Sequence, residues 1–316
     1  MTLTWIEGFE FLHGNDAFFQ AKYTTFNSSI VVSIGTGRFF GKSAHNPNFA
    51  FRPFTARDDW TIGFALNEAF TVPGTNTYDP NYYIGFLNGG VEQFTLKFKR
   101  VTDNSYKLAI LRDSTEIAVG NRVFYNSEGW HYIEIYFNAT NTGDLELRVD
   151  GFTDISITGE DLQADTTSGV DSIGFALSGD LDDLYFNSGQ EFLGEQIVEG
   201  IQFMADEGTN EWTPAGSNPK SDHFENVAPN SNPVNNYLES DVATEHESFI
   251  LSPEVVAQGQ LSGYQLDLFA ELDAAGSEDM HLEGGSIFSV SSTAWQHHGE
   301  VREVTSLPTQ QGFERD

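Results

Sequence analysis

The clearest potential for chemistry in this chain lies in closely spaced carboxylates, and three of them occur in "ESDVATE". These are Glu239, Asp241 and Glu245. Two carboxylates on one strand face can hydrolyse a glycosidic bond, one as the nucleophile and the other as the acid and base. The segment lacks the apolar alternation of a half-buried strand, so we expect a solvated acidic loop. No Ser-His-Asp set can be nominated elsewhere, and we expect no enzymatic activity.

Aromatic and amide side chains gather in "TNTYDPNYY", residues 75–83. A sugar-binding surface offers an aromatic platform beside Asn, Asp or backbone groups. Asp-Pro favours a turn, so we expect a loop here, and it is the best candidate for glycan binding. The alternative is an ordinary turn with half-buried tyrosines. The candidate ligand-binding residues are Tyr78, Asp79, Asn81, Tyr82 and Tyr83.

A third group of oxygen ligands, Asp180, Asp182 and Asp183, lies in "GDLDDLYF". Calcium ions take six or more oxygen ligands, so these aspartates are candidates for a Ca²⁺ site. No Asp-x-Asp-x-Asp-Gly loop is present. We prefer the alternative in which Asp182 or Asp183 caps a turn and accepts backbone N–H bonds. No cofactor is expected apart from this candidate ion.

Composition excludes several functional classes. The formal net charge of −32 disfavours binding to nucleic acid phosphates and to anionic membranes. The chain has no cysteine, which excludes disulfides, thiolate zinc sites and cysteine nucleophiles. No apolar run approaches the roughly 18 residues of a membrane span, and the first residues contain no secretory signal. We therefore expect folding in a cytoplasm and no membrane insertion.

Short segments of alternating hydrophobicity, separated by Gly, Asn, Asp and Pro, predict an all-β protein. Their spacing is typical of an antiparallel sandwich or jelly roll, and the 27 Phe residues suit a core between two sheets. The predicted strands of this part are residues 28–34, 60–66, 81–87, 93–99, 106–112, 130–137, 144–150, 171–177 and 182–187.

One hairpin can be predicted in detail, from "WHYIEIYF" and "DLELRVDG". Ile133, Ile135 and Phe137 are expected to face the core, and Glu134 and Arg148 to pair across the solvated face. Asp-Gly then supplies the turn to a third strand. The near-repeats "TIGFAL" and "SIGFAL" place Gly and Ala on one strand face, which allows a close approach by a ligand or, more often, by another protein layer.

The composition and the hydrophobic periodicity of the sequence change near Gly194. We predict a domain of residues 1–193 followed by a smaller, loop-rich β domain of residues 194–316. Residues 213–240 are rich in Pro, Asn and Ser and are predicted to form a linker or an extended segment. Strand-like pieces return at 248–252, 263–272 and 285–292. The second part holds 22 acidic residues against 3 basic ones, and the first holds 25 against 12.

The order of several motifs resembles the concanavalin A-like lectin/laminin-G superfamily, over about residues 5–194. The motifs are Gly8-Phe9-Glu10, the strand opened by Trp130, a strand that ends in Val-Asp-Gly, Asp182-Asp183, and Phe192-Leu193-Gly194. The members most similar in layout are bacteriophage virion proteins. The resemblance implies a concanavalin A-like jelly roll followed by a second, loop-rich β region.

The resemblance also implies a function. We expect a non-enzymatic structural protein on the exterior of a bacteriophage particle, as a tail, fibre or head-decoration component that binds a host glycan weakly. Its partners would be other virion proteins, further copies of itself and a host surface glycan. Some members of the superfamily are glucanases with a Glu-x-Asp-x-x-Glu pattern, which "ESDVATE" misses by one residue. A β-glucanase-like enzyme and a free soluble lectin are the alternatives.

Overall fold

The computed structural model describes residues 2–9, 21–26, 31–39, 41–51, 54–68, 76–125, 128–164, 166, 169–198, 203–215, 237–239, 246–251, 264–270, 278–282, 287–290, 296–302 and 310–315. Contacts between Cα atoms divide the chain into two units, Met1–Val198 and Glu199–Asp316. Among these described residues, no helix has the length and apolar character needed to cross a bilayer.

Unit 1 is built from antiparallel strands, and every strand predicted for this part overlaps with an observed one. The strands are β1 (Thr2–Glu7), β2 (Tyr23–Thr24), β3 (Val31–Thr36), β4 (Lys42–Phe51), β5 (Asp59–Glu68), β6 (Tyr78–Asn88), β7 (Val91–Thr102), β8 (Ser105–Arg112), β9 (Thr115–Val119), β10 (Phe124–Tyr125), β11 (His131–Asn138), β12 (Gly143–Val149), β13 (Phe152–Glu160), β14 (Ser172–Ala176) and β15 (Gly179–Ser188).

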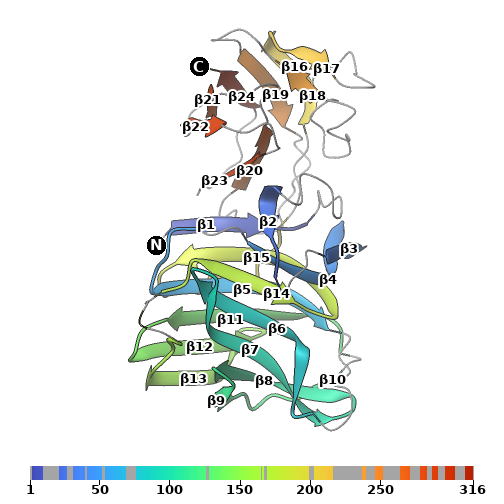
Figure 1. Cartoon of the computed structure of the whole chain (residues 1–316). Helices are drawn as coiled ribbons and strands as arrows, with labels where there is room; N and C mark the ends of the chain where they lie inside the picture. The colour runs from blue at the N-terminus through green and yellow to red at the C-terminus, as the bar shows by residue number, and fades with distance from the viewer. Residues whose placement is uncertain are drawn as a thin grey trace. The chain divides into compact units, whose positions relative to one another are not determined.

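The strands form a sheet that folds over into two layers, and β4 passes from one layer to the other (Figure 1). Residues 48–50 of β4 pair with β14, whereas Ala44 and His45 pair with β15. Asn46, between these two pairings, has a φ of 48°, a left-handed conformation that Asn tolerates better than most residues. Layer A is therefore β10-β8-β7-β6-β14-β4, and layer B is β15-β5-β11-β12-β13. The predicted all-β jelly-roll architecture is confirmed.

Phenylalanine rings from the two layers meet in the core of unit 1. Phe86 and Phe94 of layer A stack with their centroids 4.3 Å apart. The ring of Phe137, from layer B, lies edge-on at 5.1 Å from Phe86 and 5.0 Å from Phe94. Phe64 and Phe175 make a second contact between the layers at 5.9 Å. The predicted aromatic core between two sheets is confirmed.

The predicted hairpin forms in the predicted register, with Ile135 opposite Leu147 and Glu134 opposite Arg148. Asp150 and Gly151 turn the chain with φ values of 51° and 81°. However, the predicted ion pair between Glu134 and Arg148 is wrong. The Glu134 carboxylate is 2% exposed and accepts hydrogen bonds from other residues, because a later part of the chain covers this face.

Asp150 does more than turn the chain. Its Oδ1 accepts the Tyr132 N–H at 2.8 Å, and its Oδ2 lies 2.8 Å from Nη1 of Arg122 and 3.0 Å from Nδ1 of His131. Partial burial by itself would raise the pKa of this carboxyl, but the hydrogen bonds from Tyr132, His131 and Arg122 outweigh it and lower the pKa.

A folded-state pKa below the unfolded value of about 3.9 stabilises the fold above that pH, and the contribution is lost as the pH falls through the folded pKa. We therefore expect Asp150→Asn, which keeps a residue tolerant of positive φ, to lower the melting temperature at pH 7. The difference between the variant and the parent should shrink as the pH falls below the unfolded value and through the lowered folded-state pKa of Asp150. Circular dichroism melts across this pH range measure it. A difference that stayed constant down to the most acidic samples would contradict the electrostatic explanation.

The glycine-rich faces of the two near-repeats are occupied by aromatic rings of the chain itself. A Cβ on Gly63 would overlap with the ring of Tyr185, and a Cβ on Gly174 would overlap with the ring of Phe26. The close approach predicted from Gly and Ala is therefore made by rings from the same unit, one in each layer.

We expect Gly174→Ala to destabilise unit 1 by about 1–3 kcal/mol, because the added methyl group must displace the Phe26 ring. Thermal denaturation of the single and double variants measures this. In a Phe26→Ala background the same substitution should cost much less, since the space is then free. Equal costs in both backgrounds would show that the ring is not the cause.

The described residues of unit 2 also form strands, which make one five-stranded and two two-stranded sheets. The five-stranded sheet has the order β16-β19-β24-β21-β22. The ends of the predicted extended segment 213–240 pair with each other as β17 and β18, and residues 216–236 lie outside the described residues. The strands are β16 (Phe203–Asn210), β17 (Thr213–Ala215), β18 (Tyr237–Glu239), β19 (His246–Leu251), β20 (Tyr264–Ala270), β21 (Glu278–Leu282), β22 (Ile287–Val290), β23 (Gln296–Arg302) and β24 (Gln310–Arg315).

Candidate functional site: a lysine- and tyrosine-bearing sheet face

The segment predicted as a glycan-binding loop is part of strand β6, so the loop prediction is wrong. Tyr78 pairs with Lys99 of β7 and Tyr83 pairs with Lys97, so residues 79–82 form a bulge in the strand. The Asp79 side chain is fully buried within this bulge, and its Oδ1 accepts the N–H groups of Asn81 at 2.8 Å and Tyr82 at 3.2 Å. Asp79 thus shapes the bulge and is not accessible to a ligand.

The other predicted residues of this segment point in different directions. Asn81 is exposed. Tyr82 packs partly buried against the core, whereas Tyr83 is buried on the outer side of layer A beside Phe26. Tyr78 is half-buried and reaches Glu116 on β9. Only Tyr78 and Tyr83 therefore lie on a common surface, the outer face of layer A.

The strand register places lysines next to these two tyrosines. One row across the sheet runs from Tyr83 through Lys97 to Ala109, and the next runs from Tyr78 through Lys99 to Lys107. Side chains two residues apart on a strand share a face, so Lys97 and Lys99 project on the same side of β7. We call this surface, made by Tyr78, Tyr83, Lys97, Lys99 and Lys107, the lysine face.

The contacts of the lysine face leave positive charge available. The Lys97 ammonium lies 4.7 Å from the centre of the Tyr83 ring, a cation–π contact that orients the lysine without neutralising it. Lys99 Nζ lies 2.7 Å from Oε2 of Glu116. In the part of the chain that the structure describes, Lys107 makes no ion pair. All three lysines are half-buried, with their stems against the sheet.

Glu116 is the one carboxylate bound to this surface by the described contacts. Hydrogen bonds from Lys99 and then from the Tyr78 hydroxyl lower the pKa of its carboxyl. Burial, followed by the hydrogen bond to Glu116, raises the pKa of Tyr78 well above its usual range. At neutral pH the glutamate is charged and the tyrosine keeps its proton, so the surface carries three positive charges and one negative charge.

The outer face of layer B is covered by residues 190–198, which we call the covering segment. Gln190 Nε2 donates to the Tyr136 hydroxyl at 2.6 Å, and the Gly194 N–H donates to Oε1 of Glu134 at 2.8 Å. The Arg148 guanidinium lies over the ring of Phe192, 3.8 Å from its centre. These residues therefore cover the β11 part of this face, whereas the outward side chains of Glu146 and Arg148 on β12 stay partly exposed.

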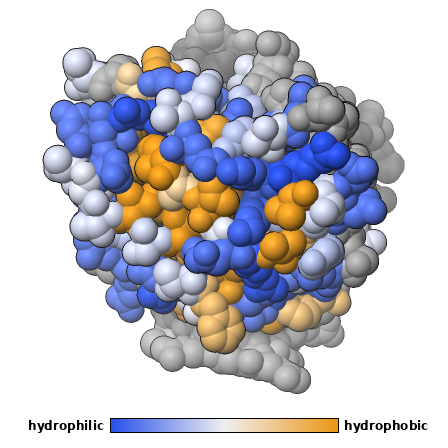
Figure 2. Space-filling model, turned by 90° about the horizontal axis from the view of Figure 1, so that it is seen from below, coloured by the Kyte–Doolittle hydropathy of each residue, from blue (hydrophilic) through white to orange (hydrophobic). Residues whose placement is uncertain are grey.

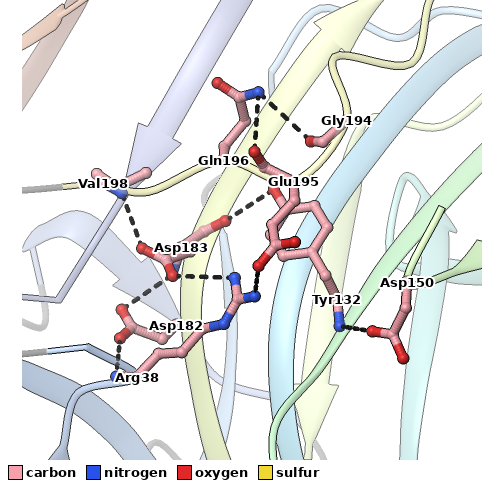
Figure 3. Close-up of polar contacts among 9 residues, drawn as sticks. All are labelled: Arg38, Tyr132, Asp150, Asp182, Asp183, Gly194, Glu195, Gln196 and Val198. Atoms are coloured by element: carbon pink, nitrogen blue, oxygen red, sulfur yellow. Dashed lines mark hydrogen bonds and ion pairs between the residues drawn. The ribbon is translucent and has the colours of Figure 1, made fainter. Parts of the chain in front are cut away.

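Two of the predicted calcium ligands, Asp182 and Asp183, accept hydrogen bonds from donors of the protein itself (Figure 3). Asp182 accepts the backbone N–H groups of Arg38 and Asp183, both at 2.9 Å. Asp183, with a φ of 50°, accepts the Val198 N–H at 2.8 Å, and its Oδ2 lies 3.5 Å from Nη1 of Arg38. Asp180 bonds to Ser43 and His45. Within the described ranges, no three or more His, Asp or Glu side chains are grouped so that they could hold a metal ion. The calcium site stays a prediction.

The carboxylates first considered for catalysis lie in unit 2. Glu239 ends β18, where it is exposed and pairs with Thr213. Asp241 and Glu245 lie outside the described residues. No geometry for a catalytic pair can be given.

Apolar side chains also reach the surface of unit 1. Figure 2 shows them gathered in a patch surrounded by hydrophilic side chains on the face seen from below. Among the exposed large hydrophobic residues described, Phe152 is 78% exposed and Tyr125 is 53% exposed. Phe152 lies on β13 of layer B, whereas Tyr125 pairs with Ser105 of β8 and so borders the lysine face on the outer side of layer A.

Sequence reasoning missed the lysines and the covering segment. The pattern "TLKFKR" could have revealed the first, because Lys97 and Lys99 alternate with core residues. The second had no comparable signal, since residues 190–198 show no periodicity.

Comparisons with known proteins give distant similarities to concanavalin A-like jelly-roll domains. No family model and no curated protein matches the chain. Domain 4 of AbnA, a GH43 extracellular arabinanase from Geobacillus stearothermophilus, in complex with arabinotriose, is 13% identical over 60% of this chain and 93% of that one, with a TM-score of 0.39. The alginate lyase Aly36B is 9% identical over 60% and 100% of the two chains, with a TM-score of 0.39. The Emp46p carbohydrate recognition domain is 8% identical over 58% and 100%, with a TM-score of 0.34. We draw nothing about the site from similarities this distant.

Proposed function

We propose that this chain is a non-enzymatic structural protein whose unit 1 binds a glycan on the lysine face. The observation that carries the proposal is the contrast between the two outer faces. The covering segment occupies the β11 part of layer B, whereas strands β6 to β8 of layer A present Tyr78 and three lysines on a continuous sheet. Aromatic rings beside polar groups on a rigid surface are what a sugar-binding site requires.

A glycan array with the full-length protein tests this role. We expect binding to at least one immobilised polysaccharide, and weaker binding by Tyr78→Ala than by Phe152→Ala, which removes an exposed aromatic ring on β13 of layer B. Absence of binding to every glycan on the array would overturn the proposal.

The alternative of a β-glucanase-like enzyme makes a different prediction. An enzyme would release reducing ends from the polysaccharide that it binds, and Glu239→Ala would abolish the release. We expect no release of reducing ends by the parent protein, because the buried carboxylates Glu134, Asp182 and Asp183 of unit 1 are held by protein donors.

The place of the protein on a bacteriophage exterior is a further part of the proposal, supported by the motif order described above and by the strongly acidic, cysteine-free composition. Quantitative mass spectrometry of purified particles from the source culture tests it. Hundreds of copies per particle would indicate a decoration or lattice role, and a few to a few dozen would indicate a tail or fibre component. Absence from the particles would overturn the virion assignment and leave a free soluble lectin.

A further inference from the structure

We propose that the ligand of the lysine face is a polyanionic glycan, a polysaccharide whose sugars carry carboxylate or sulfate groups. This inference rests on the glycan-binding role proposed above and names the class of ligand. Its basis is the distribution of charge and the register of the sheet.

The chain has few lysines, and half of them lie on the lysine face. The sequence contains six lysines within a net charge of −32, and three of the six are Lys97, Lys99 and Lys107. Unit 1 also contains many carboxylates, yet the described contacts bring only Glu116 to these ammonium groups. A local positive potential on an acidic protein selects for an anionic partner at that place.

The pairing of β7 with β8 also brings two lysines together, and their repulsion would be relieved by a bound anion. Lys99 and Lys107 are directly opposite each other on β7 and β8. Like charges at such a position destabilise a sheet, and Glu116 pairs with Lys99 alone. An anion bound on the outer face, over β7 and β8, would reduce the repulsion between the Lys99 and Lys107 ammonium groups.

The spacing of the lysines suits a polymer with repeated charges. Lys97 and Lys99 are two residues apart, which is about 6.8 Å along a strand, and Lys107 lies on the neighbouring strand about 4.8 Å away. The Lys97 ammonium lies over the buried Tyr83 ring, and the neighbouring Ala109 is small and buried. No large side chain at these two positions therefore projects above the lysines. The paired strands fix the backbone spacing of the three lysines, so binding a chain of anions has to order only their side chains.

An acidic peptide is the competing occupant, and the acidic second part of a sister copy would be one source. The geometry favours the glycan, because the lysine face lies in the middle of a paired sheet. Strands β6, β7 and β8 are hydrogen-bonded to neighbours on both sides, so no strand edge is offered for a peptide to extend.

The test uses the full-length protein and four polymers: polygalacturonate for carboxylates, dextran sulfate for sulfates, unmodified dextran as a neutral glycan, and poly-L-glutamate as an acidic peptide. Affinities are measured by biolayer interferometry at about 50 mM and about 300 mM NaCl. We expect at least one of the two charged glycans to bind about tenfold or more tightly than dextran, and the higher salt to weaken it. Which of them binds distinguishes carboxylate from sulfate.

Variants then locate the site. The double variant Lys97→Ala/Lys107→Ala should lose about tenfold or more in affinity for the charged glycan. The single variants Lys97→Ala and Lys107→Ala should each weaken it, whereas Lys42→Ala, which also removes one positive charge but from β4, should change it less than about twofold. Near-ultraviolet circular dichroism confirms that each variant is folded.

The outcomes separate the two proposals. Dextran binding as tight as that of the charged glycans would overturn the polyanion inference and leave glycan binding intact. Binding of poly-L-glutamate without any glycan would show that the occupant is a protein and overturn both. Charged-glycan binding unchanged in Lys97→Ala/Lys107→Ala would show that the site lies elsewhere.

Discussion

Phe137→Ala is expected to lower the free energy of opening of unit 1 by about 3–5 kcal/mol. Phe137 is fully buried, and it is the ring of layer B that contacts both Phe86 and Phe94 of layer A. Truncation removes these contacts and leaves a cavity that two sheets cannot easily close. Hydrogen exchange of the β5 and β11 amides measures the effect locally, which avoids assuming that a chain of two units unfolds in one step.

The matched control is Phe152→Ala, the same substitution at a side chain that is 78% exposed on β13. We expect a change within about 0.5 kcal/mol there. If the two variants lost similar stability, the assignment of the core to the space between the layers would be wrong.

Glu134→Ala should have the second largest effect and should act through the covering segment. Oε1 of Glu134 accepts the Tyr185 hydroxyl at 2.5 Å and the Gly194 N–H at 2.8 Å. Glu134 is 2% exposed, so its removal leaves one buried and one partly buried donor without this acceptor. Hydrogen bonds to a charged group contribute about 1.5–3 kcal/mol, and we expect a loss of about 2–3 kcal/mol together with faster exchange in residues 190–198.

Two further variants sharpen this result. Glu134→Gln keeps an acceptor oxygen and should lose less, because one of the two donors can still be satisfied. Glu160→Ala, at an exposed position on β13, should leave exchange in the covering segment unchanged. Rapid exchange of residues 190–198 in the parent protein would contradict the view that they lie closed over layer B.

The sequence predicts the fold of unit 1 well because periodicity reports burial directly. Ile133, Ile135 and Phe137 alternate with polar residues, and all three are in the core. The crossing strand β4 was not predicted, because Asn46 and Pro47 interrupt its pattern at the point where it changes layer. Periodicity also cannot show that a later segment of the chain covers a polar strand face. For this reason Glu134 was predicted to be solvent-exposed, although residues 190–198 cover it.

The candidate site was harder to predict, since it depends on register. The tyrosine segment attracted notice by composition, but only the bulge at residues 79–82 decides that Tyr78 and Tyr83 share a face while Tyr82 turns towards the core. The three lysines come together because Lys107 lies opposite Lys99, and pairing between strands cannot be read from one strand alone.

The most direct test of the account is a hydrogen-exchange footprint of the full-length protein with and without the glycan that it binds most tightly. We predict that protection concentrates in peptides from β6, β7 and β8 that contain Tyr78, Lys97, Lys99 and Lys107. Protection confined to β11, β12 and residues 190–198, or to unit 2 alone, would contradict the assignment of glycan binding to the lysine face.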